Sequence, residues 1–217
     1  LFRTSKYILN KNAKFILGDI NDNEYLKKII QKYKIQHVFH AAAYKHLGIL
    51  EDNLESAIKN NLFGTINVLN ALNDKVKSFV FISTDKAADP KSYLGLSKRL
   101  AEVVTQNWKK NKTSIVRFGN VFGSRGSVLE VFFDQINKNI PLTITHKSAS
   151  RYFMSIKEAC NLVLQTNSLN NKKGIFILNM GNPIKILIIA HSLLNFLNIK
   201  NYPISFTKLN KGEKIEE

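Results

Sequence analysis

The sequence has a single cysteine in 217 residues, Cys160. It stands in an apolar helical pattern with Ala159, Leu162 and Val163. This pattern predicts a buried small side chain rather than a nucleophile or half of a disulfide. One cysteine also fits a reducing compartment.

Long apolar runs, signal peptides and low-complexity linkers are also missing. No stretch reaches the roughly 18 apolar residues that a spanning helix needs. We therefore expect no membrane segment in this chain and a cytoplasmic location. The histidines show no metal-ligand spacing, so no metal is expected. They are His37, His40, His46, His146 and His191.

Acidic residues are scarce, with 16 Asp and Glu against 32 Lys and Arg, which gives a formal net charge of +16. Such a charge raises the possibility of nucleic-acid or anionic-membrane binding. The lysines, however, are scattered singly, without an arginine-rich block or a basic stripe interleaved with aromatic residues. We expect no specific nucleic-acid binding, whereas an anionic substrate is favoured electrostatically.

What is present is an alternation of short apolar runs and helical patterns. Strands are predicted at 13–17, 37–43, 78–83 and 113–118, and helices at 23–32, 53–71 and 97–110. After residue 123 the alternation of strands and helices is less regular. Further helices are predicted at 127–137, 155–167 and 185–197, and short strands at 142–145, 174–178 and 204–207. This order is typical of an α/β fold with a parallel sheet and right-handed crossovers.

The stretch 83–98 contains the largest group of polar and ionisable residues with a possible catalytic role. Ser83-Thr84-Asp85-Lys86 follows a buried apolar run, and Tyr93 to Lys98 leads into a helical pattern. Polar side chains therefore stand where a parallel strand ends and the chain turns towards a helix. Ligands of open α/β sheets bind at such points. We expect the chemistry here.

Several segments together carry a family resemblance. They are His40-Ala-Ala-Ala-Tyr-Lys-His46, Ile58 to Thr65, Ile82-Ser-Thr-Asp-Lys-Ala87, Gly95-Leu-Ser-Lys-Arg-Leu-Ala-Glu102, Val116 to Val128, Arg151-Tyr-Phe-Met154, Met180 to Ile186 and Gly212-Glu-Lys214. In this order they resemble an extended short-chain dehydrogenase/reductase. More narrowly, they are similar to the UDP-N-acetylglucosamine 4,6-dehydratases of polysaccharide biosynthesis. The resemblance covers nearly the whole chain.

The resemblance implies a Rossmann-type doubly wound parallel sheet. Residues 1–122 would form a partial NAD(P)-binding domain with the catalytic segment. Residues 123–217 would form mostly a substrate-binding lobe, which could be interleaved with the sheet. The glycine-rich strand–turn–helix that opens the family is absent, and Leu1 falls near its second strand. We therefore expect an N-terminally truncated fragment that lacks the first strand.

The resemblance also implies a reaction. Hydride is taken from C4 of the sugar, water is lost across C5 and C6, and hydride returns to C6. Lys86 is then the base for the C5 proton and Asp85 the acid for the leaving hydroxyl, while Lys98 holds the nicotinamide ribose. The chemistry needs a neutral amine and a protonated carboxyl, and burial favours both neutral forms.

The usual signature Tyr-x-x-x-Lys is out of register, because Leu94, not Tyr93, stands four residues before Lys98. Two interpretations compete. Tyr93 could have taken over, or Leu94 could match a subgroup with Met in place of Tyr. In that subgroup the residue matching Thr84 takes part in oxidation at C4. The second fits better, since Asp-Lys and Gly-x-Ser-Lys-Arg keep the family spacing.

The resemblance assigns the remaining ligand contacts, for NAD or NADP and for a UDP-sugar, in a homo-oligomer. The cofactor residues are Asp19, Ile20, Ala41, Ala42, Ala43, Lys45, Asn61 and Lys98. The substrate residues are Asn120, Ser124, Arg125, Arg151 and Glu213. Taken alone, Asn61 could be a helix-surface amide and Arg151 part of a surface ion pair.

The sequence is also compatible with three other functions. A UDP-sugar 4-epimerase of the same superfamily is the alternative enzyme. A non-catalytic nucleotide-binding relic is supported by the missing glycine loop, by Leu94, and by Asn210-Lys211 where the family has Arg-Pro. A basic nucleic-acid-binding protein rests on charge alone.

Overall fold

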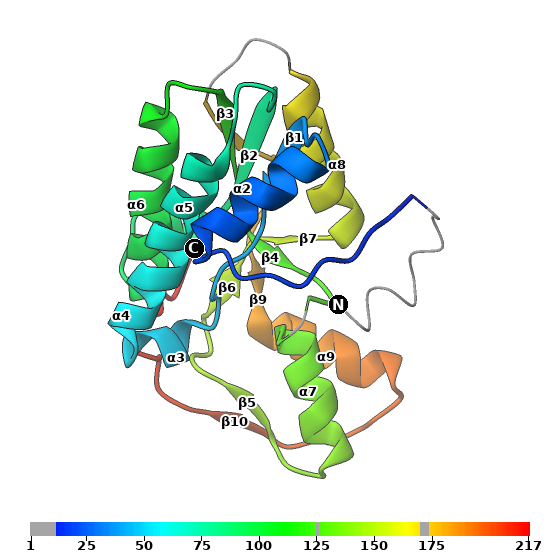
Figure 1. Cartoon of the computed structure of the whole chain (residues 1–217). Coiled ribbons are helices and arrows are strands. Elements are labelled where there is room, and N and C mark those ends of the chain that lie inside the picture. Colours follow the sequence, from blue (N-terminus) through cyan, green and yellow to red (C-terminus); the bar gives the residue numbers. More distant parts are fainter. Residues whose placement is uncertain (1–11, 125, 170–173) are drawn as a thin grey trace.

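The computed structural model describes residues 12–124, 126–169 and 174–217. Its centre is a parallel sheet with the strand order β1-β2-β3-β8 (Figure 1). These strands are β1 (His37–His40), β2 (Ser78–Thr84), β3 (Lys112–Phe118) and β8 (Ile175–Ile177). The predicted α/β class with a parallel, doubly wound sheet is confirmed.

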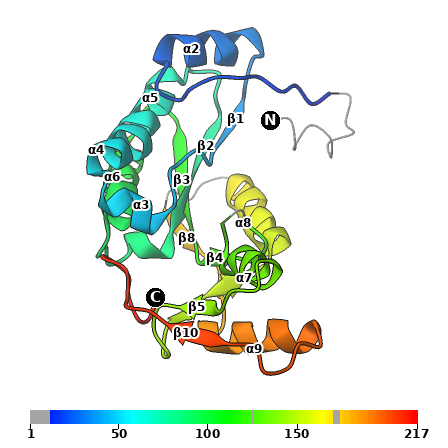
Figure 2. The ribbon, with the colours of Figure 1, turned by 90° about the horizontal axis from the view of Figure 1, so that it is seen from below.

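Helices cover both faces of this sheet (Figure 2). The helices α2 (Asn23–Lys32), α5 (Gly64–Ala71) and α6 (Tyr93–Asn107) lie on one side, and α8 (Ile156–Ser168) lies on the other. Side chains alternate along β2, so Phe79 and Phe81 join the α2–α5–α6 core while Val80 packs with Leu162 of α8. Burial on both faces explains why β2 reads as a continuous apolar run.

The stretch predicted as one helix over 53–71 is divided. After α3 (Leu47–Glu51), which the sequence pattern missed, come α4 (Leu54–Ala57), a π-helical segment η1 (Ile58–Phe63) and then α5. Within η1, the Asn61 side chain is buried and exchanges two hydrogen bonds with the backbone of Tyr44. Such π segments are wider than an α-helix and recur at functional sites.

The helix α6 begins four residues before the predicted start at residue 97 and ends at Asn107 rather than at residue 110. The Ser92 hydroxyl accepts a hydrogen bond from the Gly95 N–H and so caps the helix. The Glu51 carboxylate accepts another from the Tyr93 N–H at 2.6 Å. The earlier start places Leu94 and Lys98 one turn apart on the same face.

The strand predicted at 13–17 is wrong. Phe15 and Leu17 are 40% and 81% exposed, and the segment pairs with no strand in the described part of the chain. An isolated extended segment cannot satisfy its backbone groups through a ladder. The following helix α2 has the predicted bounds, and the Asp22 carboxylate caps it by accepting from the Tyr25 N–H.

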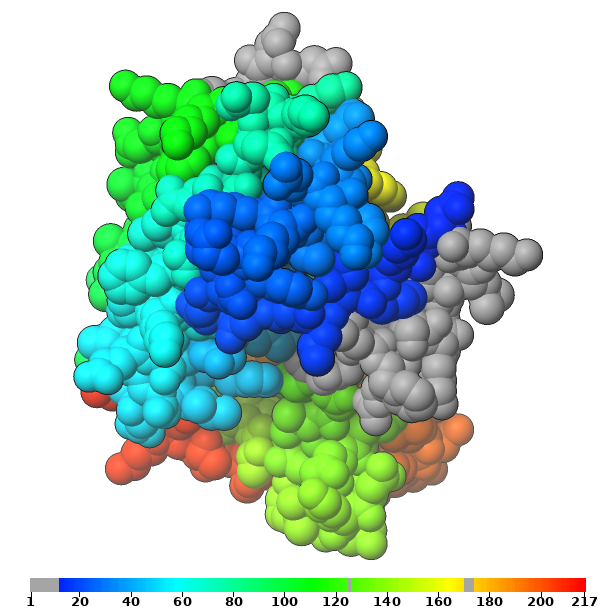
Figure 3. Space-filling model, viewed as in Figure 1, coloured from blue at the N-terminus to red at the C-terminus, as the bar shows by residue number. Residues whose placement is uncertain are grey.

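The second lobe has its own core around Phe132, Leu142, Ile144, Ala190 and Leu193. These residues belong to α7 (Val128–Asn137), α9 (Ile186–Phe196) and β5 (Leu142–Ile144), and β5 pairs with β10 (Ile204–Phe206). In the space-filling view, the light green, orange and red surface of this lobe lies below the blue and cyan N-terminal part (Figure 3).

Short strands join the two parts of the chain. The pair β4 (Asn120–Val121) and β7 (Phe153–Met154) is parallel, and β6 (Ser150–Arg151) and β9 (Ile184–Lys185) are antiparallel. The chain then re-enters the main sheet, because α8 packs on it and β8 pairs with β3. The division into domains at residues 122 and 123 stays a prediction.

Two further sequence expectations concern α8 and membranes. Cys160 is exposed rather than buried, because Ala159, Leu162 and Thr166 form the inward face of α8. In the described ranges, no helix combines the length and the apolar character that crossing a bilayer requires.

Candidate functional site

A cavity of about 480 Å³ opens at the carboxyl ends of β1, β2 and β3, where the two lobes meet. Parallel α/β sheets bind ligands at this edge. The predicted residues that line it are Thr84, Lys86, Lys98, Ala41, Ala43, Lys45, Asn120 and Ser124. The structure thus brings together residues that are more than 80 positions apart in the sequence.

Lys86 lies in the 3₁₀ turn η2 (Asp85–Ala87), directly after β2. Its Nζ is 3.1 Å from Asp85 Oδ1, 3.4 Å from Glu217 Oε1 and 3.5 Å from Asn120 Oδ1. The side chains of Lys86 and Asp85 are only 17% and 12% exposed. The pair is therefore held at the cavity rather than being a solvated turn pair.

Asp85 does not line the cavity itself. Its Oδ1 accepts hydrogen bonds from Thr84 Oγ1 at 2.9 Å and from the Lys86 N–H at 2.8 Å. Its Oδ2 is buried and has no hydrogen-bond partner within the described structure. Thr84 and Lys86 thus both bind Oδ1 of this carboxyl group and line the cavity, while Oδ2 stays unpartnered in the described structure.

Lys98 is 5% exposed, and its Nζ donates to the carbonyl oxygen of Ile82. The amine also lies 3.9 Å from the ring centroid of Phe81. Burial lowers the pKa of Lys98 to about 7, although the charge of Glu102 opposes the shift. The amine is thus close to its titration midpoint at neutral pH.

The position four residues before Lys98 also faces the cavity. Leu94 is buried and lines it, whereas Tyr93 does not. The Tyr93 ring instead lies 5.7 Å from Lys211 Nζ. The helix start at Tyr93 produces this arrangement, because Leu94 and Lys98 share a face.

His40 is a buried group behind the cavity. It lies beside the rings of Phe79 and Phe81, and its Nε2 is 3.0 Å from Thr65 Oγ1. Burial lowers the pKa of His40 to about 3, and the charge of Lys98 acts in the same direction. At neutral pH the ring is therefore uncharged.

Several predicted cofactor residues lie away from the cavity. Asp19 is exposed, and its carboxylate accepts from the Asn21 N–H, which lowers its pKa. Ile20 packs against the core beside α2, and Ala42 is not part of the cavity wall. Asn61 is 1% exposed, so the reading as a helix-surface amide is wrong. Its amide braces the Tyr44 backbone and donates to Ser97 Oγ.

The predicted phosphate ligand Arg151 is buried among protein groups. Its Nη2 is 2.8 Å from Glu213 Oε1, and its Nη1 donates to the carbonyls of Ser150 and Ile215. Neither Arg151 nor Glu213 lines the cavity. Arg151 and Glu213, both predicted to bind substrate, instead form an ion pair with each other. This pair is buried, so the interpretation of Arg151 as part of a surface ion pair is wrong.

The loop between β4 and α7 closes the cavity on the side of the second lobe. Ser124, Gly126 and Ser127 line it, and Gly126 lies so close to the His46 ring that an added Cβ would be 2.5 Å from it. Arg125, also predicted to bind substrate, lies outside the described residues. No cluster of His, Cys, Asp or Glu in the described ranges has a metal-binding arrangement.

Two features of the site were missed from the sequence. The rings of Phe122 and Phe153 stack at 4.5 Å and form an apolar wall of the cavity. Both phenylalanines lie in segments that carry the family resemblance, but an isolated phenylalanine in a sequence does not indicate a ligand contact. Glu217 reaches Lys86 from the far end of the chain, and no local motif indicates such a contact.

Comparisons with known proteins show the family of the chain. The family model described as "Polysaccharide biosynthesis protein" matches residues 3–217. "Probable polysaccharide biosynthesis protein EpsC" of Bacillus subtilis is 42% identical over 207 residues, which are 93% of this chain and 35% of that protein. The chain thus spans about a third of that relative's length.

A second relative and a solved structure extend the likeness. A UDP-glucose 4-epimerase of Rickettsia rickettsii is 35% identical over 212 residues, covering 94% of this chain and 61% of that protein. The structure of DesIV, a dTDP-glucose 4,6-dehydratase of Streptomyces venezuelae with NAD and TYD bound, superposes with a TM-score of 0.89. That match covers 98% of this chain and 72% of DesIV at 17% identity, and so bears on the fold. The chain belongs to the polysaccharide biosynthesis protein family, with the fold of the short-chain dehydrogenase/reductases.

Proposed function

We propose that this chain carries the catalytic centre of an NAD(P)-dependent 4,6-dehydratase that acts on UDP-N-acetylglucosamine. The product would be a UDP-4-keto-6-deoxy sugar for polysaccharide synthesis. The observation that carries the proposal is the Asp85–Lys86 pair, in which Lys86 lines the cavity and its Nζ is 3.1 Å from Asp85 Oδ1. An elimination needs both a base and an acid, and this pair offers both.

Lys86 is the base in this proposal. Its amine lines the cavity and takes the C5 proton, which is acidic once C4 is a ketone. Asn120, 3.5 Å from the amine, orients it towards the cavity. Lys86 must lose its own proton before it can act as the base.

Asp85 is the acid, and gives a proton to the C6 hydroxyl as that group leaves as water. Its unpartnered Oδ2 is the atom free to hold this proton. Because Asp85 lies behind the cavity wall, we propose that the substrate hydroxyl enters between Thr84 and Lys86. Thr84 Oγ1 already donates to the same carboxyl group at 2.9 Å.

The residues at the β2 end fit the nicotinamide half of a cofactor. Lys98 Nζ and the carbonyl of Ile82 are polar groups beside the small residues Ala41 and Ala43. A ribose hydroxyl would bind Lys98 there, next to the sugar. The cofactor supplies the acceptance and return of hydride. Asp19 accepts from the Asn21 N–H and Asn61 from the Tyr44 N–H, so these two residues are not part of the proposed cofactor contacts.

The alternative is a 4-epimerase, which the relative from Rickettsia rickettsii supports. A tyrosine-dependent epimerase needs its phenol beside the sugar. Leu94 stands at that place in the cavity wall, and Tyr93 does not line the cavity. This arrangement favours the dehydratase.

The test is product analysis by NMR after incubating the chain with UDP-N-acetylglucosamine and NAD or NADP. We expect a 4-keto-6-deoxy sugar signal, absent in the variant D85N. A C4 epimer formed without the keto product would establish the alternative and contradict the proposal. Ligand binding without either product would instead indicate a non-catalytic nucleotide-binding protein.

A further inference from the structure

The last residues of the chain run through the junction between the lobes. We define residues 210–217 as the tail segment. It is anchored to β6, because the Ser150 N–H donates to the Ile215 carbonyl at 2.8 Å and Ser150 pairs with Glu216 in an isolated parallel bridge. Two carboxylates are thereby brought beside the cations of the site.

The first carboxylate, Glu213, is fixed on the side of the second lobe. Its Oε1 accepts from Arg151 Nη2 at 2.8 Å and from Thr145 Oγ1 at 2.9 Å. Its Oε2 accepts from the Asn210 N–H at 3.0 Å, which closes the turn of the tail segment. These hydrogen bonds fix the backbone of the tail segment at Glu213 against the second lobe.

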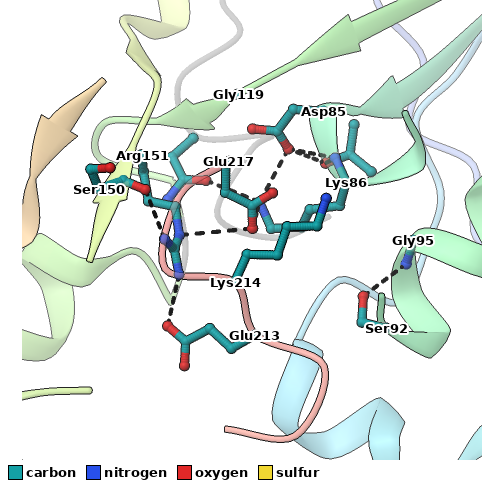
Figure 4. Close-up of polar contacts among 12 residues, drawn as sticks. Asp85, Lys86, Ser92, Gly95, Gly119, Ser150, Arg151, Glu213, Lys214 and Glu217 are labelled. Atoms are coloured by element: carbon teal, nitrogen blue, oxygen red, sulfur yellow. Dashed lines mark hydrogen bonds and ion pairs between the residues drawn. The ribbon is translucent and has the colours of Figure 1, made fainter. Parts of the chain in front are cut away.

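The second carboxylate, Glu217, reaches the catalytic motif. Its side chain is 3% exposed, and its Oε1 is 3.4 Å from Lys86 Nζ and 3.8 Å from Arg151 Nε. Figure 4 shows the Glu217 carboxylate between the Lys86 amine and the Arg151 guanidinium. A buried carboxylate needs such partners to remain charged.

A further ion pair ties the tail to the turn after the catalytic motif. Lys214 Nζ is 3.2 Å from Asp89 Oδ2, and this contact lowers the pKa of Asp89. Gly212 lies against Ser92, so closely that a Cβ on Gly212 would be 2.8 Å from Ser92 Cβ. The tail thus contacts the catalytic lobe at several points between Lys86 and the start of α6.

We propose that Glu217 is a positioning residue for Lys86. Its carboxylate anchors the Lys86 amine together with that of Asp85, so that the tail segment sets the position of the proposed base. This inference rests on the proposed function for its catalytic meaning, but the contact itself is testable without turnover. Glu217 touches neither the cavity nor, on this account, the substrate.

The experiment is trace acetylation of the full chain with acetic anhydride at fixed neutral pH. The fraction of Lys86 modified is measured by peptide mass spectrometry relative to the other lysines. In E217Q we expect Lys86 to react about fivefold faster, because the Glu217 carboxylate no longer holds the amine at 3.4 Å. E216Q, which removes the same charge from the exposed neighbouring residue, keeps the wild-type rate. E217D keeps the carboxylate and stays closer to wild type than E217Q.

Thermal melting of each variant separates positioning from loss of fold, since unfolding raises the reactivity of all lysines together. Equal Lys86 rates in E217Q and E216Q would overturn the inference, even in a chain that forms the expected keto sugar. A selective rise in E217Q would sustain the contact between Glu217 and Lys86 even in a chain that forms no product. The two proposals therefore fail separately.

Discussion

At the scale of single residues, the account depends on which side chain acts as the base. Replacing Lys86 by methionine keeps its length but removes the amine. We expect K86M to lower turnover by about 100-fold or more, the usual contribution of a positioned base. Y93F should stay within about threefold of wild type, because Tyr93 lies outside the cavity. Steady-state rates that fall equally in both variants would indicate tyrosine chemistry instead.

His40 predicts how stability depends on pH. Its pKa is about 3 in the folded protein and about 6.5 when unfolded, so between these values the unfolded chain binds the extra proton. The free energy of unfolding should fall by about 1.4 kcal/mol per pH unit as pH drops from about 6.5 towards 3. Urea titrations of wild type and H40Q should show this slope in their difference. If the free energies of unfolding of wild type and H40Q changed equally with pH, the predicted contribution of His40 would be wrong.

At the scale of elements, the contact between α6 and the turn η2 is very close. A Cβ on Gly95 would lie 2.5 Å from the Lys86 carbonyl oxygen, which is backbone and cannot rotate away. We expect G95A to lower the free energy of unfolding by about 1–3 kcal/mol through overpacking.

Gly48 in α3 provides the matched control, because a Cβ there meets nothing within 4 Å. G48A should raise the free energy of unfolding by about 0.5–1 kcal/mol, as alanine favours the helix. Calorimetric melting of both variants checks the pair. Equal shifts in the two would contradict the close packing of α6.

A buried ion pair joins α6 to β3. Glu102 is fully buried and binds Arg117 through two bonds, Nε–Oε1 at 2.8 Å and Nη2–Oε2 at 2.6 Å. Burial raises the pKa of Glu102, but the hydrogen bonds from Arg117 and Arg99 outweigh it, and the net shift is downward. E102Q leaves Arg117 buried without its counter-charge, which should cost about 3–5 kcal/mol.

The exposed pair of Asp134 and Lys138 is the comparison for this effect, at 2.7 Å with both side chains more than half exposed. D134N should change the free energy of unfolding by less than about 1 kcal/mol. Chemical denaturation measures both variants. An E102Q protein as stable as D134N would contradict the expected cost of leaving Arg117 without its counter-charge.

At the scale of the whole molecule, much of the fold could be predicted from periodicity. Helix α2 matches its predicted bounds, and the predicted elements after residue 123 differ by only a residue or two. Strand β1 ends three residues before its predicted end. The failures have local causes. The start of α6 depends on Glu51, which is distant in sequence, and segment 13–17 has strand composition without a described neighbour to pair with.

The site was predictable only in part. A motif reveals that Asp85 and Lys86 follow a strand, and the cavity at that point agrees. It does not reveal that Arg151 is bound by Glu213, or that Glu217 returns to Lys86. Such contacts depend on how the two lobes pack, and long-range packing leaves no periodic signal in the chain.

The central claim is an elimination at C5 and C6 with internal transfer of hydride. The most direct test uses UDP-N-acetylglucosamine deuterated at C4, followed by NMR and mass spectrometry of the product. The account predicts deuterium at C6 of a 4-keto-6-deoxy sugar and one solvent hydrogen at C5. Deuterium retained at C4 of an epimerised sugar, with none at C6, would contradict it.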